Sequence, residues 1–229
     1  GDLKYEIPPL NPDFDTSVVQ GKLNNTSVSS PTVPPFPEIP ANLPIQTSLS
    51  VANNALETIN GDGDYPSIEV KSGGRLNINS GVPGDSIDVL VDSLNIKGEV
   101  YVSGEGTVTI TVLNSCEFSG GIFSAPDPNR FRIHFVNPSE DFSLAANGLF
   151  PGTLFLEQET VKLTGTGSFG GPVICKESVS NVTVNGGFSG LNLYSPNSTI
   201  TISGNAKLEG WVFGRDVTVS GTAEISYSE

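Results

Sequence analysis

The sequence predicts an all-β protein: a single-stranded, right-handed parallel β-helix (a β-solenoid) preceded by an extended proline-rich segment. Glycine and proline, the residues that disfavour helices most, supply 26 and 17 of the 229 positions. A unit of alternating apolar and polar residues closed by glycine recurs at the spacing of a solenoid coil. A β-sandwich, the alternative, explains the alternation but not that spacing. Right-handedness is the usual sense of parallel crossovers.

Residues 1–65 are expected to form an extended proline-rich segment packed along the solenoid. Six prolines lie between residues 30 and 44, and each fixes its own φ and biases the preceding residue toward extended backbone. Residues 48–60 predict a short helix, and residues 60–66 predict a turn. A disordered linker is the alternative for the proline-rich part. Apolar residues interleave with the prolines and favour a surface-bound segment: Phe36, Ile39, Leu43 and Ile45.

The repeat occupies residues 66–229, which we expect to form the β-helix domain. Strict alternation is the period of a strand, and the closing glycine permits the positive φ of a corner. The last four closing glycines lie at positions 165, 186, 204 and 221, so the spacings are 21, 18 and 17 residues. The copies of the unit are 94–98, 100–104, 161–165, 182–186, 200–204 and 217–221, with a variant at 76–81.

A second unit, an apolar residue followed two positions later by glycine, precedes the alternating unit within a repeat. It begins at Phe118, Phe169, Phe188 and Leu208. Each repeat is therefore expected to form short strands joined by glycine corners and to stack on the next repeat at about 4.8 Å. The inward positions would then stack in columns and build the core: Val182, Val184, Ile200, Ile202, Val217 and Val219.

Residues 125–160 interrupt the repeat and predict an insertion. Residues 130–136 have the pattern of a strand, with Phe131, Ile133 and Phe135 on one face. Residues 137–152 are expected to form a loop with a short helical turn. Insertions of this kind usually lie on one side of a solenoid.

The acidic composition limits the classes of partner. The chain has 25 acidic and 11 basic residues, a net charge of −14 and a pI near 4.3. This charge argues against nucleic acid and anionic lipid as partners, and self-repulsion favours a monomer in isolation. No apolar run approaches the roughly 18–20 residues of a membrane helix. Abundant Ser, Thr and Asn fit a bacterial exported protein.

Residues 194–227, YSPNSTITISGNAKLEGWVFGRDVTVSGTAEISY, resemble the C-terminal domain of the PilX-like proteins, relatives of type IV pilus minor pilins. The ending departs from that pattern, because Ile225-Ser226-Tyr227 stands where His-Tyr-Asp often stands. The proline-rich PFPEIP also resembles the stretch before the repeat domain of such proteins. The positions that fit the pattern are Tyr194, Pro196, Asn197, Gly204, Asn205, Ala206, Gly210, Gly214 and Gly221.

This resemblance implies a β-helical ectodomain outside the cytoplasm, on a bacterial surface or pilus. Membrane attachment would run only through an N-terminal hydrophobic helix that this sequence does not contain. The expected partners are pilus subunits or a polysaccharide. A weaker likeness is to cellulose-adhering surface proteins with a β-helix core.

The single histidine, His134, is the one candidate base for Ser-His or Cys-His catalysis. Its position in the alternating strand, on the side of Arg130 and Arg132, predicts a solvent-facing side chain. The sequence also lacks the Asp-Asp pair of many polysaccharide hydrolases and lyases. We therefore expect a protein without catalytic residues, with a polysaccharide-active β-helix enzyme as the alternative.

One motif has the ligand spacing of a calcium loop. Asn60, Asp62 and Asp64 have the alternating oxygen-ligand spacing that opens a calcium loop. Lys71 stands at the twelfth position, where such a loop carries Glu. Calcium is therefore the one cofactor considered, and a plain turn is the alternative reading.

Two aromatic residues are candidates for binding a polysaccharide. Trp211 and Tyr194 fall outside the apolar columns, so we expect both side chains to be exposed. Phe188 and Phe213 hold repeat positions, so we expect both in the core.

The two cysteines occupy different places in their coils. Cys116 and Cys175 are therefore expected to be two buried thiols, and a disulfide between them is the alternative.

The leading functional hypothesis is a non-enzymatic, extracytoplasmic surface or adhesion protein, the soluble ectodomain of a pilus-associated, minor-pilin-like protein. A carbohydrate-binding surface protein that acts independently of pili is the first alternative. A polysaccharide-active β-helix enzyme is the second.

Overall fold

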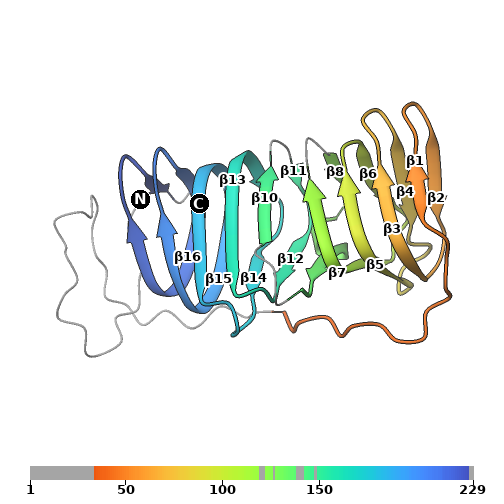
Figure 1. Cartoon of the computed structure of the whole chain (residues 1–229), viewed down its shortest axis with the longest axis horizontal. Helices are drawn as coiled ribbons and strands as arrows, with labels where there is room; N and C mark the ends of the chain where they lie inside the picture. The colour runs from red at the N-terminus through yellow and green to blue at the C-terminus, as the bar shows by residue number, and fades with distance from the viewer. Residues whose placement is uncertain (1–33, 119–121, 126, 138–141, 147–148, 227–229) are drawn as a thin grey trace.

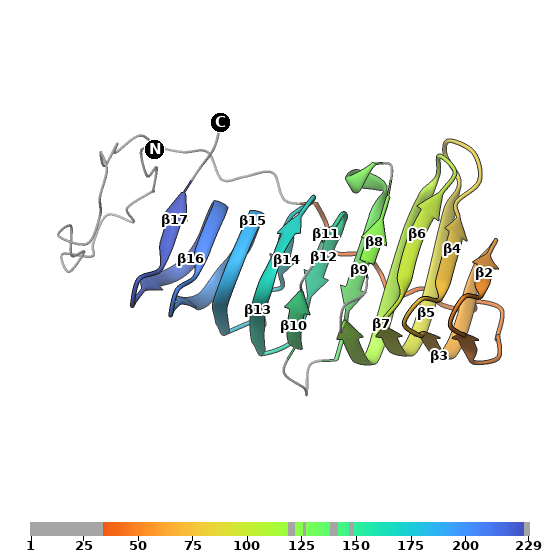
Figure 2. The ribbon, with the colours of Figure 1, turned by 90° about the horizontal axis from the view of Figure 1, so that it is seen from above.

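The computed structural model describes residues 34–118, 122–125, 127–137, 142–146 and 149–226. The chain forms a β-solenoid of about eight turns, as the sequence predicts. Figure 1 and Figure 2 show the coils stacked in order along the long axis. Every strand pair that the structure describes is parallel, because each coil pairs with the next coil in the same direction. Among the described residues, no helix has the length and apolar character to span a membrane.

The strands form one thirteen-stranded and one four-stranded sheet. The larger sheet contains β1 (Leu49–Val51), β3 (Gly63–Val70), β5 (Ser86–Ile96), β7 (Thr107–Phe118), β9 (Phe131–Phe135), β10 (Phe142–Ala146), β11 (Leu149–Phe150), β12 (Thr153–Leu156), β13 (Thr160–Phe169), β14 (Val173–Cys175), β15 (Asn181–Ile202), β16 (Lys207–Val219) and β17 (Glu224–Ser226). The smaller sheet contains β2 (Leu56–Ile59), β4 (Arg75–Asn79), β6 (Glu99–Ser103) and β8 (Ile122–Ser124). A single 3-10 turn, Pro128–Arg130, is described between β8 and β9.

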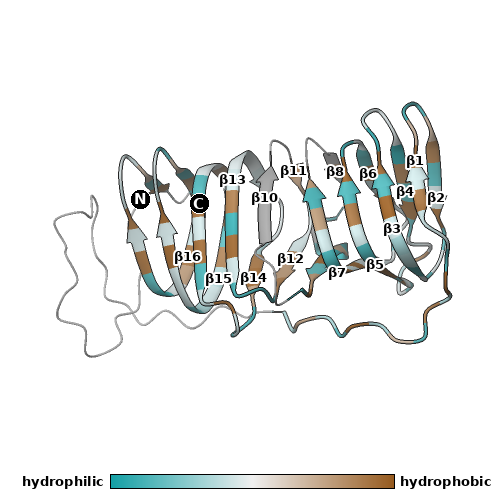
Figure 3. Ribbon diagram, in the orientation of Figure 1, coloured by the Kyte–Doolittle hydropathy of each residue, from teal (hydrophilic) through white to brown (hydrophobic). Residues whose placement is uncertain are grey.

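The core consists of the inward columns that the alternation predicts. Val182 pairs with Val161, and Val184 pairs with Leu163, both of the preceding coil. The alternation of apolar and polar residues along the strands is visible in Figure 3 as brown and teal bands. Most of the predicted inward residues are fully buried: Val182, Val184, Ile200 and Ile202.

The last coil differs from this expectation. Val217 is 42% exposed and Val219 is only half-buried. Both residues pair with the preceding coil, opposite Ile200 and Ile202, but no described strand pairs with them on their other side. An inward residue becomes buried only when coils cover it from both sides, so the pattern alone overestimates burial at this end.

The predicted helix at residues 48–60 is wrong. This stretch forms β1 and β2, joined by a turn in which Asn54 has a positive φ of 60°. Val51 pairs with Val70 and Ile59 with Ile78, so its apolar residues extend the inward columns of the solenoid. Residues 49–65 therefore belong to the coils, and the β-helix begins earlier than position 66. Tertiary pairing overrides the local helix preference here.

The predicted insertion at residues 125–160 is also wrong in its described parts. β9, β10, β11 and β12 all join the larger sheet; β9 pairs with β7 and β12, and β10 pairs with β13. Ile133 and Leu154 pair and are fully buried, so this stretch continues the core. Part of the predicted loop, residues 138–141 and 147–148, lies outside the described residues.

The N-terminal segment lies on the outside of the coils. Residues 34–48, which we call the strap, run along the solenoid without regular strands (Figure 1). Two main-chain hydrogen bonds hold its C-terminal end. The main-chain N–H of Gln46 donates to the carbonyl of Asp64 at 2.8 Å, and the main-chain N–H of Asp64 donates to the carbonyl of Pro44 at 2.9 Å. The strap therefore packs on the solenoid as expected. Residues 1–33 of the predicted proline-rich segment lie outside the described residues.

Candidate functional site

A column of outward-facing side chains runs along five consecutive coil layers, and we call it the outer track. Its members alternate along their strands with inward residues such as Leu154 and Leu193, which fill the core. Because the strands are parallel and in register, side chains at equivalent positions lie beside one another from coil to coil. The outer track consists of His134, Phe155, Ile174, Tyr194 and Phe213.

The strap covers the beginning of the outer track. The Phe36 ring meets Phe155 edge-on with centroids 5.2 Å apart, and it meets His134 with centroids 5.9 Å apart. The ammonium of Lys176 lies 5.9 Å from the centroid of the same Phe36 ring, within the range of a cation–π contact. His134 and Phe155 are fully buried although both point away from the core. The expectation of a solvent-facing His134 is therefore wrong: the direction is right, but the strap lies over the residue.

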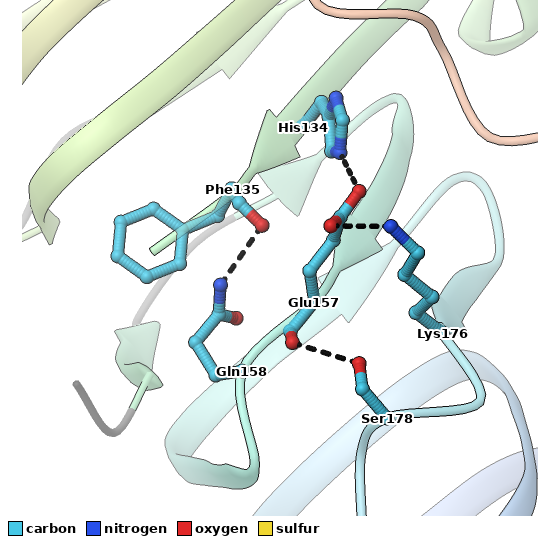
Figure 4. Close-up of polar contacts among 6 residues, drawn as sticks. All are labelled: His134, Phe135, Glu157, Gln158, Lys176 and Ser178. Carbon is cyan, nitrogen blue, oxygen red and sulfur yellow. Dashed lines mark hydrogen bonds and ion pairs between the residues drawn. The ribbon is translucent and has the colours of Figure 1, made fainter. Parts of the chain in front are cut away.

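A chain of titratable side chains links three coils (Figure 4). His134 Nε2 lies 2.8 Å from Glu157 Oε1, and Lys176 Nζ lies 2.6 Å from Glu157 Oε2. Two further hydrogen bonds connect neighbouring coils at this point. The Ser178 hydroxyl donates to the Glu157 carbonyl at 3.0 Å, and the Gln158 side-chain amide donates to the Phe135 carbonyl at 2.8 Å. Glu157 therefore holds its two partners from the middle coil.

The imidazole in this chain favours its neutral form. Burial is the main cause that lowers the pKa of His134. The hydrogen bond and the negative charge of Glu157 oppose this shift in the pKa, and the positive charge of Lys176 adds to it. The other ring nitrogen, Nδ1, is buried and has no hydrogen-bond partner among the described residues.

The far end of the outer track carries a stacked aromatic pair. The rings of Tyr194 and Phe213 have centroids 5.1 Å apart and planes inclined by 9°. Both side chains are half-buried. Trp211 lies on the same side of β16 as Phe213, opposite Asn192 of the neighbouring coil, and is also half-buried. We call Tyr194, Trp211 and Phe213 the aromatic platform.

The two predicted ligand-binding residues therefore lie on one face of adjacent coils. Tyr194 and Trp211 point outward, as expected, and each keeps part of its surface exposed. Phe188 is buried in the core, as expected. The expectation for Phe213 is wrong: Val212 pairs with the buried Leu193 and takes the inward place, so Phe213 turns outward. The outward direction of Phe213 could have been predicted from Trp211-Val212-Phe213, since the two aromatic residues of an alternating strand must share a face.

A shallow groove is lined by residues of β13, β15, β16 and β17, and Gly210 separates its β16 residues from Trp211. Its walls include Ser189, Lys207 and Glu209, and Gly187 contributes a stretch of bare backbone. The groove faces outward because Phe188 and Leu208, which alternate with these residues, turn toward the core. The groove therefore presents hydrogen-bonding groups on the last coils.

The predicted calcium ligands have other partners. The Asn60 side-chain oxygen accepts a hydrogen bond from the Asn79 amide at 3.2 Å, and Asp62 Oδ1 accepts one from the Asp88 main-chain amide at 2.9 Å. Asp64 lies within β3 and bonds the strap through its main chain. In the described part of the chain, no three His, Cys, Asp or Glu side chains lie together as a metal site. Calcium binding stays a prediction.

The two cysteines are free thiols. Cys175 is buried, which raises the pKa of its thiol to about 12, while a hydrogen bond from Ser195 has a smaller opposing effect. Cys116 is half-buried, and desolvation raises the pKa of its thiol strongly as well. Neither sulfur is activated as a nucleophile, since the thiolate is the reactive form.

Comparison of the chain with protein-family models, curated proteins and solved structures finds no match.

Proposed function

We propose that this protein is a non-enzymatic surface or adhesion protein that acts outside the cytoplasm and binds a polysaccharide through the aromatic platform. The observation that carries the proposal is the parallel stack of Tyr194 and Phe213, 5.1 Å apart on the outer face of adjacent coils. Trp211 stands on the same face. Partly exposed aromatic rings offer large apolar area, together with a polar tip on Tyr and Trp.

The solenoid supports this role because it holds the rings in fixed positions. Main-chain pairing between β15 and β16 sets the separation of Tyr194 and Phe213, so little conformational freedom is lost when a ligand binds. The groove residues Lys207, Glu209 and Ser189 supply hydrogen-bond donors and acceptors for sugar hydroxyls nearby. A stack of coils also offers an extended surface, which suits a polymeric ligand.

Binding to insoluble polysaccharides tests the proposal. The full chain is incubated with cellulose, chitin and xylan, and the unbound fraction is measured over a range of protein concentration. We expect at least one polymer to retain the wild-type protein. W211A, Y194A and F213A should each weaken retention by about tenfold, as loss of a central aromatic contact does in other interfaces.

A matched control separates binding from stability. Tyr101 is a half-buried tyrosine on β6, in the other sheet. The polymer should retain Y101A as well as it retains the wild-type protein. If the platform variants and Y101A bind equally well while remaining folded by circular dichroism, the platform is not the binding site. Retention on none of the polymers would remove the proposed ligand class.

Association with a pilus is the finer proposal, and it rests on the resemblance of residues 194–227 to PilX-like proteins. Pro196 and Asn197 of that stretch lie within β15, at the register shift between Ser195 and Thr199, and the Asn197 side-chain amide donates to the Glu177 carbonyl at 3.3 Å. Co-sedimentation with purified type IV pili is expected if the protein is a pilus-associated ectodomain. Polysaccharide retention without co-sedimentation would favour the pilus-independent alternative.

The absence of catalysis is part of the proposal. His134 lies under Phe36, and its Nε2 is engaged with Glu157, which leaves it poorly placed to activate a nucleophile. Reducing-sugar and lyase assays on the polymers that retain the protein should give no product above the background. Product formation that H134Q abolishes would support the enzyme alternative.

A further inference from the structure

The contact between the strap and the outer track contains a titratable group. We propose that the strap is a pH-dependent latch, which lies on the outer track while His134 is neutral and lifts away when that imidazole is protonated. The latch does not depend on the proposed polysaccharide or on any other ligand.

The described contacts hold the strap at two places. Phe36 is seated on His134, Phe155 and Lys176. Pro44 and Gln46 are tied to Asp64 through main-chain hydrogen bonds. Ile39, between the two places, is 49% exposed, so this part of the strap contributes less burial. Release at Phe36 can therefore occur while the main-chain anchor holds.

Protonation of His134 conflicts with its surroundings when the strap is seated. A second N–H would appear at Nδ1, which is buried and has no acceptor among the described residues. A buried donor without a partner carries a desolvation penalty, and a charged one carries more. The hydroxyl of Thr111, the register neighbour of His134 on β7, is also buried without a described partner. Nδ1 would meet water if Phe36 lifted from the ring.

The nearby charges do not compensate the new proton. The charged groups that act on His134 are Glu157, which follows β12, and Lys176, which follows β14. Glu157 already has the positive partner Lys176 at 2.6 Å. The groups that face the ring from β12 and from the strap are the apolar rings of Phe155 and Phe36. A protonated imidazole is therefore better accommodated in the open arrangement.

The direction of the pH effect follows from this difference. Burial lowers the pKa of His134 while the strap is seated, and a water-exposed imidazole returns to a pKa of about 6.5. The open arrangement thus binds the proton more tightly, so acidification below that value favours opening. Opening would expose Phe155, which adjoins Ile174 and continues the outer track toward Tyr194.

Hydroxyl-radical footprinting of the full chain tests the latch. The rate of modification of Phe36 and Phe155 is measured at a pH of about 7.5 and again at about 5, on either side of the ordinary histidine pKa. For the wild-type protein we expect both rates to rise about threefold or more at the lower pH. Phe188, a buried core residue, should stay protected at both values.

Two variants identify the group responsible. H134Q retains a hydrogen-bonding side chain that does not titrate, so Phe36 and Phe155 should be modified at the same rate at both pH values. H134F keeps an aromatic ring under Phe36 and serves the same purpose if H134Q does not fold. F36A should expose Phe155 at both pH values.

Two results would overturn the proposal. One is unchanged protection of Phe36 and Phe155 in the wild-type protein across the pH range. The other is a pH response of the same size in H134Q or H134F, which would assign the effect to another group. Because the readout contains no polysaccharide, it is independent of whether the aromatic platform binds sugar.

Discussion

Nε2 of His134 lies 2.8 Å from Oε1 of Glu157, one coil further along the stack, although both residues belong to the outer surface of the solenoid. The Phe36 ring of the strap packs against the imidazole of this pair. The strap thus creates a second buried layer outside the core, and that layer contains the titratable imidazole of His134. The first prediction concerns its effect on stability.

Acidification should destabilise the wild-type protein more than H134Q. The folded-state pKa of His134 is lowered, so the unfolded chain binds the proton more tightly. The stability contributed by the neutral imidazole is present at pH values above about 6.5 and is lost as the pH falls from there toward the lowered folded-state value. Urea unfolding at a series of pH values measures the difference between the two proteins. Parallel pH profiles would contradict the role assigned to His134.

Shortening an inward side chain should cost far more than shortening its outward neighbour. Ile202 is fully buried in an apolar column, whereas Thr201 faces outward on the same strand and is half-buried. I202A should lower the free energy of unfolding by about 2–5 kcal/mol, and T201A by about 0.5 kcal/mol or less. Chemical denaturation of both variants checks the prediction. Similar losses in the two variants would contradict the inward and outward assignment.

The two adjacent glycines that end an alternating unit should respond differently to alanine. A Cβ at Gly186 would collide with the main chain of Gly165 in the preceding coil, and backbone cannot give way cheaply. A Cβ at Gly187 would meet only Thr166 Cγ2, at an ordinary 3.8 Å. G186A should therefore lower the melting temperature by several degrees, and G187A should leave it nearly unchanged. A larger effect of G187A would mean that the coils do not stack in this register.

The two thiols should be unreactive in the folded protein. Desolvation raises the pKa of Cys175 to about 12 and that of Cys116 strongly, so neither forms appreciable thiolate near neutral pH. Ellman's reagent should titrate no more than a trace of thiol before unfolding and two thiols per chain in denaturant, without added reductant. One or no thiol in denaturant would indicate oxidation or a bridge.

The solenoid could be predicted from the sequence because its strongest signals are local and repeated. Alternating units such as those ending at Gly186 and Gly204 fix which residues face inward, and their spacing fixes the coil length. The prediction failed at residues 48–60, where a helix-compatible stretch joins the columns through Val51 and Ile59. It failed again at residues 125–160, where strands without the glycine signature still pair with their neighbours.

The candidate site was predictable only in part. Tyr194 and Trp211 could be assigned outward positions, since they alternate with apolar core residues. Phe213 was missed because a repeat alignment placed it with core residues, while the register between β15 and β16 gives that place to Val212. The stack with Tyr194 depends on this register.

The sequence by itself determined the parallel solenoid and the inward sides of its repeated alternating units, because alternation and glycine spacing are properties of the chain read in order. Only the tertiary structure decided which outward residues are buried. Phe36 reaches His134 and Phe155 across the outside of several coils. The period of a strand specifies the direction of a side chain, but burial also depends on what a distant segment places over it.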